Sequence, residues 1–239
     1  MGSITLRQAV RRILEEDDLR EAAGKLFDLA TLDPGEEAEE STGNNGPLHK
    51  IQTTVAQARA AIREGLYKVG DVVLDKNGFQ WRLVDIRNDN YTLMTTTAFT
   101  YAPFSRPDKQ HPWGWNDWAE SQIRCELNNM WLERMFGEEK NSIITHYGGM
   151  GKIFLLSVEE AGFKQTEQTL DYFRLSEDVD EDELNRRRSM LDYEGDECTW
   201  WLRSPIPGDA YYVRRVLSDG SLYSSSASDG YGAAAACVI

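Results

Sequence analysis

The most constraining feature of this sequence is a bulky motif near the C-terminus that opens a stretch of different composition. The motif reads Thr-Trp-Trp-Leu-Arg-Ser-Pro over residues 199–205. The 34 residues that follow, 206–239, contain no Lys, Glu, Gln, Met or Trp, although the chain has seven tryptophans. Ser, Asp, Gly, Ala, Tyr and Arg fill this stretch instead. Because Tyr and Arg give a large contact area while Ser and Gly adapt, recognition surfaces are often built from such residues. The sequence therefore predicts a scaffold with a binding surface at its end.

Length and composition predict a folded chain. With 239 residues the chain is long enough for one sizeable domain plus an appendage, and its 41% hydrophobic residues support a core. The net charge of −14 argues against a nucleic-acid partner, which needs a basic surface. No apolar run approaches the roughly 20 residues of a membrane helix, and the N-terminus lacks the pattern of a signal peptide. We therefore expect no membrane insertion.

The first 65 residues predict an N-terminal helical segment. Apolar residues recur at helical spacing over 4–31, and a second helix is expected over 48–64. Between them, the acidic and then Gly/Asn-rich stretch 33–47 predicts a linker. Two such helices can pack on the domain that follows or mediate formation of a homo-oligomer. Both alternatives remain open.

Residues 66–239 predict an α+β domain that begins with strands. The turn signal Asn77-Gly78 lies between two β-prone runs, 69–74 and 79–86, and therefore predicts a hairpin. A second turn leads into a further strand over 91–96.

Helical periodicity and capping signals follow in the middle of the chain. Apolar spacing predicts a helix over 120–136. Ser157 and Glu160 have the spacing of a capping box directly after 153–156, which we expect to be a buried strand. The segment 164–196 is strongly charged and has no strand signal, so we expect an exposed helix there that ends in three arginines.

The Trp-Trp motif itself is expected to be structural. Adjacent strand residues point to opposite faces, and core packing is favoured for both Trp200 and Trp201. Arg203 is expected to pair with a buried carboxylate or to cap a loop. Trp113 and Trp115, in a loop containing prolines, could flank the binding surface or fill the fold.

The order of these motifs resembles a bacterial and phage domain family of uncharacterised function. The matching segments are Trp-Trp-Leu-Arg-Ser-Pro at 200–205, Gln-Trp-Arg-Leu-Val at 80–84, the helix at 118–128 and Ile-Phe-Leu-Leu-Ser-Val-Glu-Glu-Ala at 153–161. That family is similar to the C-type-lectin-like fold shared by formylglycine-generating enzymes and the variable proteins of diversity-generating retroelements. The resemblance covers about 67–239. It implies a C-type-lectin-like domain, which the expected N-terminal helices precede. Because the signal-peptide pattern is lacking, a cytoplasmic location or association with a phage particle is expected.

This resemblance gives the C-terminal composition a genetic interpretation. In such variable proteins the C-terminal segment is mutated at adenines, mostly in Asn-type codons, and the randomised codons end in a pyrimidine. Such codons cannot encode Lys, Glu, Gln, Met or Trp, which are the types that 206–239 lacks. This favours a segment diversified over about 206–236, with chance or turn chemistry as the alternative. The chain departs from the family pattern at 232–237, where Gly-Ala-Ala-Ala-Ala-Cys lacks the family's Arg and Pro, so the contacts of the last strand are expected to differ.

The binding hypothesis assigns ligand contacts to the polar and aromatic residues of this segment. Side chains alternate along a strand, so only about half of them can face a ligand, and Val213, Val216 and Leu222 are expected to point inward. The expected ligand is a protein or a surface glycan. The candidate residues are Asp209, Tyr211, Tyr212, Arg214, Arg215, Ser218, Asp219, Ser221, Tyr223, Ser225, Ser226, Ser228, Asp229 and Tyr231.

The sequence predicts no enzyme, no cofactor and no metal site. His49, His111 and His146 are isolated from one another, and the three cysteines form no CxxC pair and are expected to be buried free thiols. An oxidase resembling formylglycine-generating enzymes is one alternative, with Cys198 and Cys237 as its cysteine pair. Another is an interaction module of the same fold without diversification, in which the N-terminal helices make the functional contact.

Overall fold

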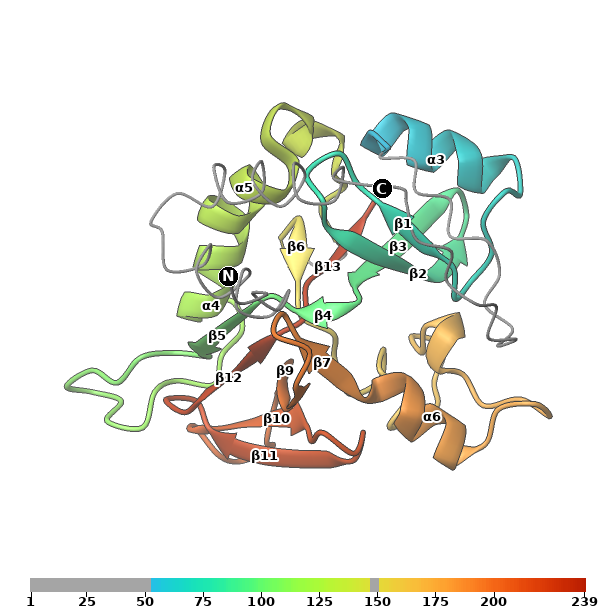
Figure 1. Cartoon of the computed structure of the whole chain (residues 1–239). Helices are drawn as coiled ribbons and strands as arrows, with labels where there is room; N and C mark the ends of the chain where they lie inside the picture. Colours follow the sequence, from blue (N-terminus) through green and yellow to red (C-terminus); the bar gives the residue numbers. More distant parts are fainter. Residues whose placement is uncertain (1–52, 147–150) are drawn as a thin grey trace, which may run out of the picture. The chain divides into compact units, whose positions relative to one another are not determined.

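The computed structural model describes residues 53–146 and 151–239; the expected helix at 4–31 and linker at 33–47 lie outside them. The described residues form an α+β structure with strands in three sheets (Figure 1). No described helix is long and apolar enough to cross a membrane.

The first sheet is built around the predicted hairpin. Its strands, in spatial order, are β1 (Val72–Leu74), β2 (Gln80–Arg87), β3 (Asn90–Thr95), β13 (Ala236–Val238) and β6 (Ile153–Phe154). β1 and β2 pair in antiparallel register across the Asn77-Gly78 turn, as expected. The second predicted turn is also present, with Asn88 and Asp89 both at positive φ between the paired residues Arg87 and Asn90. Positive φ at both central residues is the geometry of a tight hairpin turn.

The Trp-Trp motif forms the central strand of the second sheet. Its strands, in spatial order, are β11 (Leu222–Ser226), β10 (Tyr212–Val216), β9 (Trp200–Pro205), β12 (Gly230–Ala233) and β5 (Thr100–Pro103). Trp200 and Trp201 are both fully buried. The indole of Trp200 donates to the carbonyl oxygen of Arg188 and that of Trp201 to the carbonyl oxygen of Ala102, each at 2.9 Å. Both rings are therefore core residues with satisfied donors.

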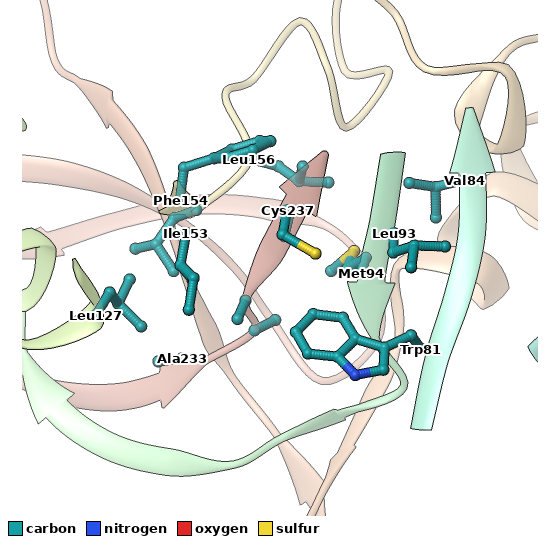
Figure 2. Packing of buried hydrophobic residues seen from close by; sticks show 14 of the residues in the cluster. Trp81, Val84, Leu93, Met94, Leu127, Ile153, Phe154, Leu156, Ala233 and Cys237 are labelled. Carbon is teal, nitrogen blue, oxygen red and sulfur yellow. The ribbon is translucent and has the colours of Figure 1, made fainter. Parts of the chain in front are cut away.

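The alanine run after β12 carries the chain from the second sheet to the first. Residues 233–236 are all fully buried. Thr95 of β3 donates to the carbonyl oxygen of Ala235 at 2.8 Å, and the amide of Ala235 donates to the Thr95 hydroxyl at 3.1 Å. Figure 2 shows the strand that follows, with Cys237 between Leu93 and Ile153 of its two neighbours. Small side chains suit this crossing because all four alanines lie within the hydrophobic core.

The helix predicted over 120–136 is present, and a π-helical section divides it. It consists of α4 (Gln122–Glu126), η1 (Leu127–Trp131) and α5 (Leu132–Phe136). Asn128 connects η1 to β6: its Oδ1 accepts from the amides of Lys152 and Ile153, and its Nδ2 donates to the carbonyl oxygen of Ile153 at 2.8 Å. One side chain thus satisfies the open edge of a two-residue strand.

The remaining helical segments of the described chain are short. α3 (Val55–Arg63) begins at a capping box and buries Val55, Ala58 and Ile62 in the core of the unit 51–239. After α5 the chain forms the 3₁₀ helix η2 (Gly137–Ser142), and a second 3₁₀ helix, η4 (Asp171–Phe173), precedes α6 (Glu181–Arg188).

The expectation that 164–196 contains no strand is wrong, because β7 (Met190–Asp192) lies within this segment. A third sheet has the order β4 (Thr97–Ala98), β7 and β8 (Glu197–Cys198). Met190 and Asp192 are buried, whereas Leu191 between them is 46% exposed. This short strand pairs with β4, which is distant in the sequence, and no local residue pattern predicts it.

Four further expectations are corrected. α6 is not fully exposed, because Arg188 is only 1% exposed and donates to the carbonyl oxygens of Ala161 and Gly162 at 2.8 Å. The thiol of Cys125 is exposed rather than buried. Residues 155–156 are buried but lie beyond β6, and residues 101–103, at the start of the proline-containing segment expected to be a loop, belong to β5.

Candidate functional site

The C-terminal hairpin divides the candidate residues between the two faces of the second sheet. β10 and β11 pair in regular antiparallel register, which places Arg215 opposite Tyr223 and Tyr212 opposite Ser226. Directly opposed side chains share a face, and neighbours along a strand point to opposite faces. One face, called here the Arg215 face, is defined by Arg215, Tyr223, Ser225 and Tyr231. Tyr212 and Arg214 lie on the other face.

The Arg215 face is an ordered stack of aromatic and polar groups. The guanidinium carbon of Arg215 lies 4.2 Å from the ring centroid of Tyr231 and 5.3 Å from that of Tyr223. Tyr231 in turn packs edge-on against Trp201, with ring centroids 4.9 Å apart, and its hydroxyl lies 3.2 Å from the hydroxyl of Ser225. Tyr223 is 58% exposed. The arginine is thus held between one fixed and one open tyrosine.

A second group of candidates lies against the long loop at Trp113. The Ser226 hydroxyl donates to the carbonyl oxygen of Trp113 at 2.8 Å, and the amide of Ser228 donates to the same oxygen at 3.1 Å. The two serine hydroxyls are 3.0 Å apart. The Trp113 side chain is 61% exposed, so it flanks the C-terminal segment and remains open to a partner. Asp229 is exposed beside this group.

Several candidates have their polar atoms occupied within the fold. Asp209 accepts from the amides of Tyr211 and Tyr212 at 2.6 and 3.0 Å. Asp219 accepts from the amide and hydroxyl of Ser221, and this hydrogen bonding lowers the pKa of Asp219. Such turn-forming carboxylates shape the backbone and are poor choices for ligand contact. Ser218, with Asp219, borders a small hollow of about 320 Å³.

A separate cleft of about 950 Å³ was not predicted as a site. Its volume lies within the range of small-molecule pockets. It is lined by residues from distant parts of the chain, among them Asp85, Trp115, His146, Glu160 and Arg203. His146, for which the sequence indicated no partner, has its Nε2 3.3 Å from Glu160 Oε1.

The buried charged groups Glu160 and Asp85 of this cleft are each paired with an arginine. Arg203 donates to both carboxylate oxygens of Glu160, at 2.6 Å for Oε1, as well as to the carbonyl oxygen of Leu155. Burial alone would raise the pKa of Glu160, but hydrogen bonds from His146 and Arg203, together with the Arg203 charge, lower it to about 2. Across the cleft, burial raises the pKa of Asp85, which pairs with Arg87 at 3.0 Å. Arg203 therefore has the structural partner that the sequence predicts, a buried carboxylate.

The two cysteines of the oxidase alternative lie on different sheets. Cys198 belongs to β8 and Cys237 to β13. Burial raises the pKa of the Cys198 thiol to about 11 and raises that of Cys237 as well. Because the thiolate is the reactive form, both environments favour an unreactive thiol. Among residues 53–146 and 151–239, no group of three or more His, Cys, Asp and Glu side chains is arranged to hold a metal ion.

Comparison with known proteins gives a family and no further relative. No curated protein and no solved structure matches the chain. A family model described as a domain of unknown function, DUF6273, matches residues 88–239. This range runs from the turn before β3 to the last residue and includes the Trp-Trp strand, the C-terminal hairpin and the alanine run. Because the match covers more than half of the chain, the protein belongs to the DUF6273 family.

Proposed function

We propose that this protein is a non-enzymatic ligand-binding protein whose C-terminal segment, about 206–236, is a recognition surface diversified by a retroelement. One observation carries the proposal. Large side chains of the hairpin stand exposed, Tyr212 by 46% and Tyr223 by 58%, while Val213 and Val216 on the same strand are fully buried. Exposed aromatic groups on an otherwise buried framework are typical of interfaces.

Burial divides the positions of this segment into those that the core requires and those that we propose are free to vary. Its buried residues, including Ala227 and the alanines of 233–236, fill the core, whereas Tyr and Asp, with Gly and Pro, hold its exposed positions, and Arg and most of the Ser residues are half-buried. A segment randomised through codons that end in a pyrimidine would contain these residue types and would lack Lys, Glu, Gln, Met and Trp, as 206–239 does. We further propose the C-type-lectin-like fold for the domain, on the resemblance of its motifs.

The two alternatives receive less support from the described residues. The oxidase would need a reactive thiol, and burial raises the pKa of both Cys198 and Cys237. The undiversified module and our proposal predict different DNA around the gene. A near-copy of the segment beside a reverse transcriptase gene, differing only at adenines, is expected if the segment is diversified, and its absence would favour the module.

A binding experiment tests the surface directly. Partners of the full chain are first selected from a phage-displayed random peptide library and from a glycan array. We expect Tyr212→Ala/Tyr223→Ala to weaken binding to the selected partner at least about tenfold, because the double variant removes the exposed tyrosine from each face of the hairpin and exposed tyrosines often dominate the affinity of an interface. The matched control is Tyr193→Ala, which removes a 47% exposed tyrosine outside the segment. Equal binding by the double variant and the control would contradict the proposal.

A further inference from the structure

Within the described part of the chain, Arg215 has no counter-ion, although the protein has a large excess of acid. The chain has 40 Asp and Glu against 26 Lys and Arg. Two other poorly exposed arginines form ion pairs with acidic residues, Arg203 with Glu160 and Arg188 with Glu181. Arg215 makes no ion pair or hydrogen bond with any residue of 53–146 or 151–239, and its Nε is buried without an acceptor. A desolvated donor without a partner is costly. The two terminal nitrogens of the guanidinium also have no acceptor among the described residues but are not buried, so a ligand can reach them.

The two tyrosines stabilise the charge without occupying its donors. Contacts of 4.2 and 5.3 Å to the ring centroids of Tyr231 and Tyr223 are cation–π distances. Trp201 and Ser225 fix Tyr231, so Arg215 is largely ordered before any ligand arrives. An ordered side chain loses little entropy on binding, and a guanidinium presents a planar fork that matches a carboxylate.

We infer that Arg215 is the anchor of the proposed surface for a carboxylate, supplied by an acidic segment of a protein partner. This inference rests on the proposed function and adds the chemistry of the ligand to it. Arg214, next along the strand, lies on the other face of the sheet, so on the Arg215 face of this molecule of net charge −14 the positive charge comes from Arg215. An acidic segment is attracted there and repelled elsewhere, which gives specificity of position. Tyr223 and Trp113 add the exposed aromatic area that protein partners use.

Selection from a random peptide library displayed on phage tests the inference. The full chain is compared with three variants: Arg215→Gln removes the charge, Arg215→Lys keeps the charge without the planar fork, and Arg134→Gln is the matched control. Arg134 also stacks on an aromatic ring, with its guanidinium carbon 5.3 Å from the Trp131 ring centroid, and is exposed on α5. In Figure 1 α5 lies on the opposite side of the described domain from β10 and β11.

We expect the wild type and Arg134→Gln to select peptides enriched in Asp and Glu, and Arg215→Gln to lose this enrichment. Against a synthetic copy of one selected peptide, Arg215→Gln is expected to weaken binding at least about tenfold, as for a charge-assisted hydrogen bond, and Arg215→Lys to retain only part of the affinity. Changing the acid of the peptide to its amide should have the same effect on the wild type and little effect on Arg215→Gln.

The outcomes separate this inference from the proposed function. Selected peptides without an acidic bias, or no selected peptide at all, would overturn the carboxylate anchor. If binding depends on Tyr212 and Tyr223 but not on Arg215, the proposed surface stands and the anchor does not. If the selected peptides bind equally well to every variant of the segment, both fail. Thermal unfolding of Arg215→Lys shows whether the fold is retained in a variant that keeps the charge.

Discussion

Glu160 joins three distant parts of the chain through one buried carboxylate. It accepts from the amide of Ser157 at 2.9 Å, completing the capping box that the sequence predicts. It also binds Arg203 of β9 and lies 3.3 Å from His146. Since the net effect of these contacts is a pKa of about 2, the folded state strongly favours the ionised carboxylate.

We expect Glu160→Gln to lower the free energy of unfolding at pH 7 by roughly 3 kcal/mol, because Arg203 remains buried without its counter-charge. Folding lowers the pKa of Glu160 from the usual 4.5 to about 2. The ionised carboxylate therefore stabilises the fold fully above about pH 4.5, and this contribution is lost as the pH falls toward 2. Urea unfolding at several pH values should show the difference between wild type and variant shrinking over that range.

The control for this prediction is Glu183→Gln. Glu183 pairs with Arg186 and Arg187 on the surface of α6, where solvent screens the interaction, so its loss should change the free energy of unfolding by less than about 1 kcal/mol. An equal loss in both variants, or a loss in Glu160→Gln that does not change with pH, would show that the buried pair is not the cause.

Elements set by local chemistry were predictable, and elements set by distant pairing were not. Asn77-Gly78 places a hairpin because the turn itself requires those residues. β7 is three residues long, with Leu191 46% exposed, and exists because β4 pairs with it from nearly a hundred residues away. Arg188 was expected in solvent because nothing in a charged run indicates that two carbonyl oxygens will bind it.

The candidate site divides in the same way. Val213 and Val216 are both fully buried, as their apolar character predicted, although strict alternation would place residues three apart on opposite faces; the pairing of β10 with β9 shifts register between Val213 and Arg215. The residue pattern could not show that Asp209 and Asp219 are used to form turns, nor that Arg215 is held between two tyrosines, because Tyr231 comes from a non-adjacent strand of the sheet.

Gly220 is a fixed point within the β10–β11 hairpin. Its φ is +83°, and an added Cβ would lie 2.0 Å from the carbonyl oxygen of Asn185 on α6. Gly208, in the same C-terminal segment, has φ +80° with open space around the corresponding position. We expect Gly208→Ala to cost about 1 kcal/mol from the positive φ alone. Gly220→Ala should cost a further 1–3 kcal/mol or so, because α6 and the hairpin must separate.

Chemical denaturation of the two glycine variants measures this difference. Equal stabilities would mean that the hairpin turn does not depend on contact with α6. In a collection of sequences diversified over this segment, Gly220 should accordingly be retained where Ser218 and Ser221 vary.

At the scale of the whole domain, the second sheet combines a buried central strand with an edge hairpin that exposes side chains. Trp200 and Trp201 at its centre are fully buried with both indole donors satisfied, whereas the hairpin at its edge exposes Tyr212 and Tyr223. The strand pairing that holds the hairpin uses backbone groups, which every residue except proline supplies. Exposed side chains can therefore change without loss of the framework that displays them.

This separation predicts opposite results for outward and inward changes on the same hairpin. Replacing Tyr212, Tyr223 and Asp229 together with Ser should leave the midpoint of thermal unfolding within about 5 °C of wild type, because exposed substitutions each change stability little. Val213→Ser/Val216→Ser should lower it by more than about 8 °C, since each change leaves a cavity and a buried hydroxyl. Circular dichroism measures both, and binding to selected partners is expected to fail in the first variant although it is folded. Comparable unfolding of the two variants would mean that the exposed tyrosines belong to the scaffold and that the hairpin is not a display surface.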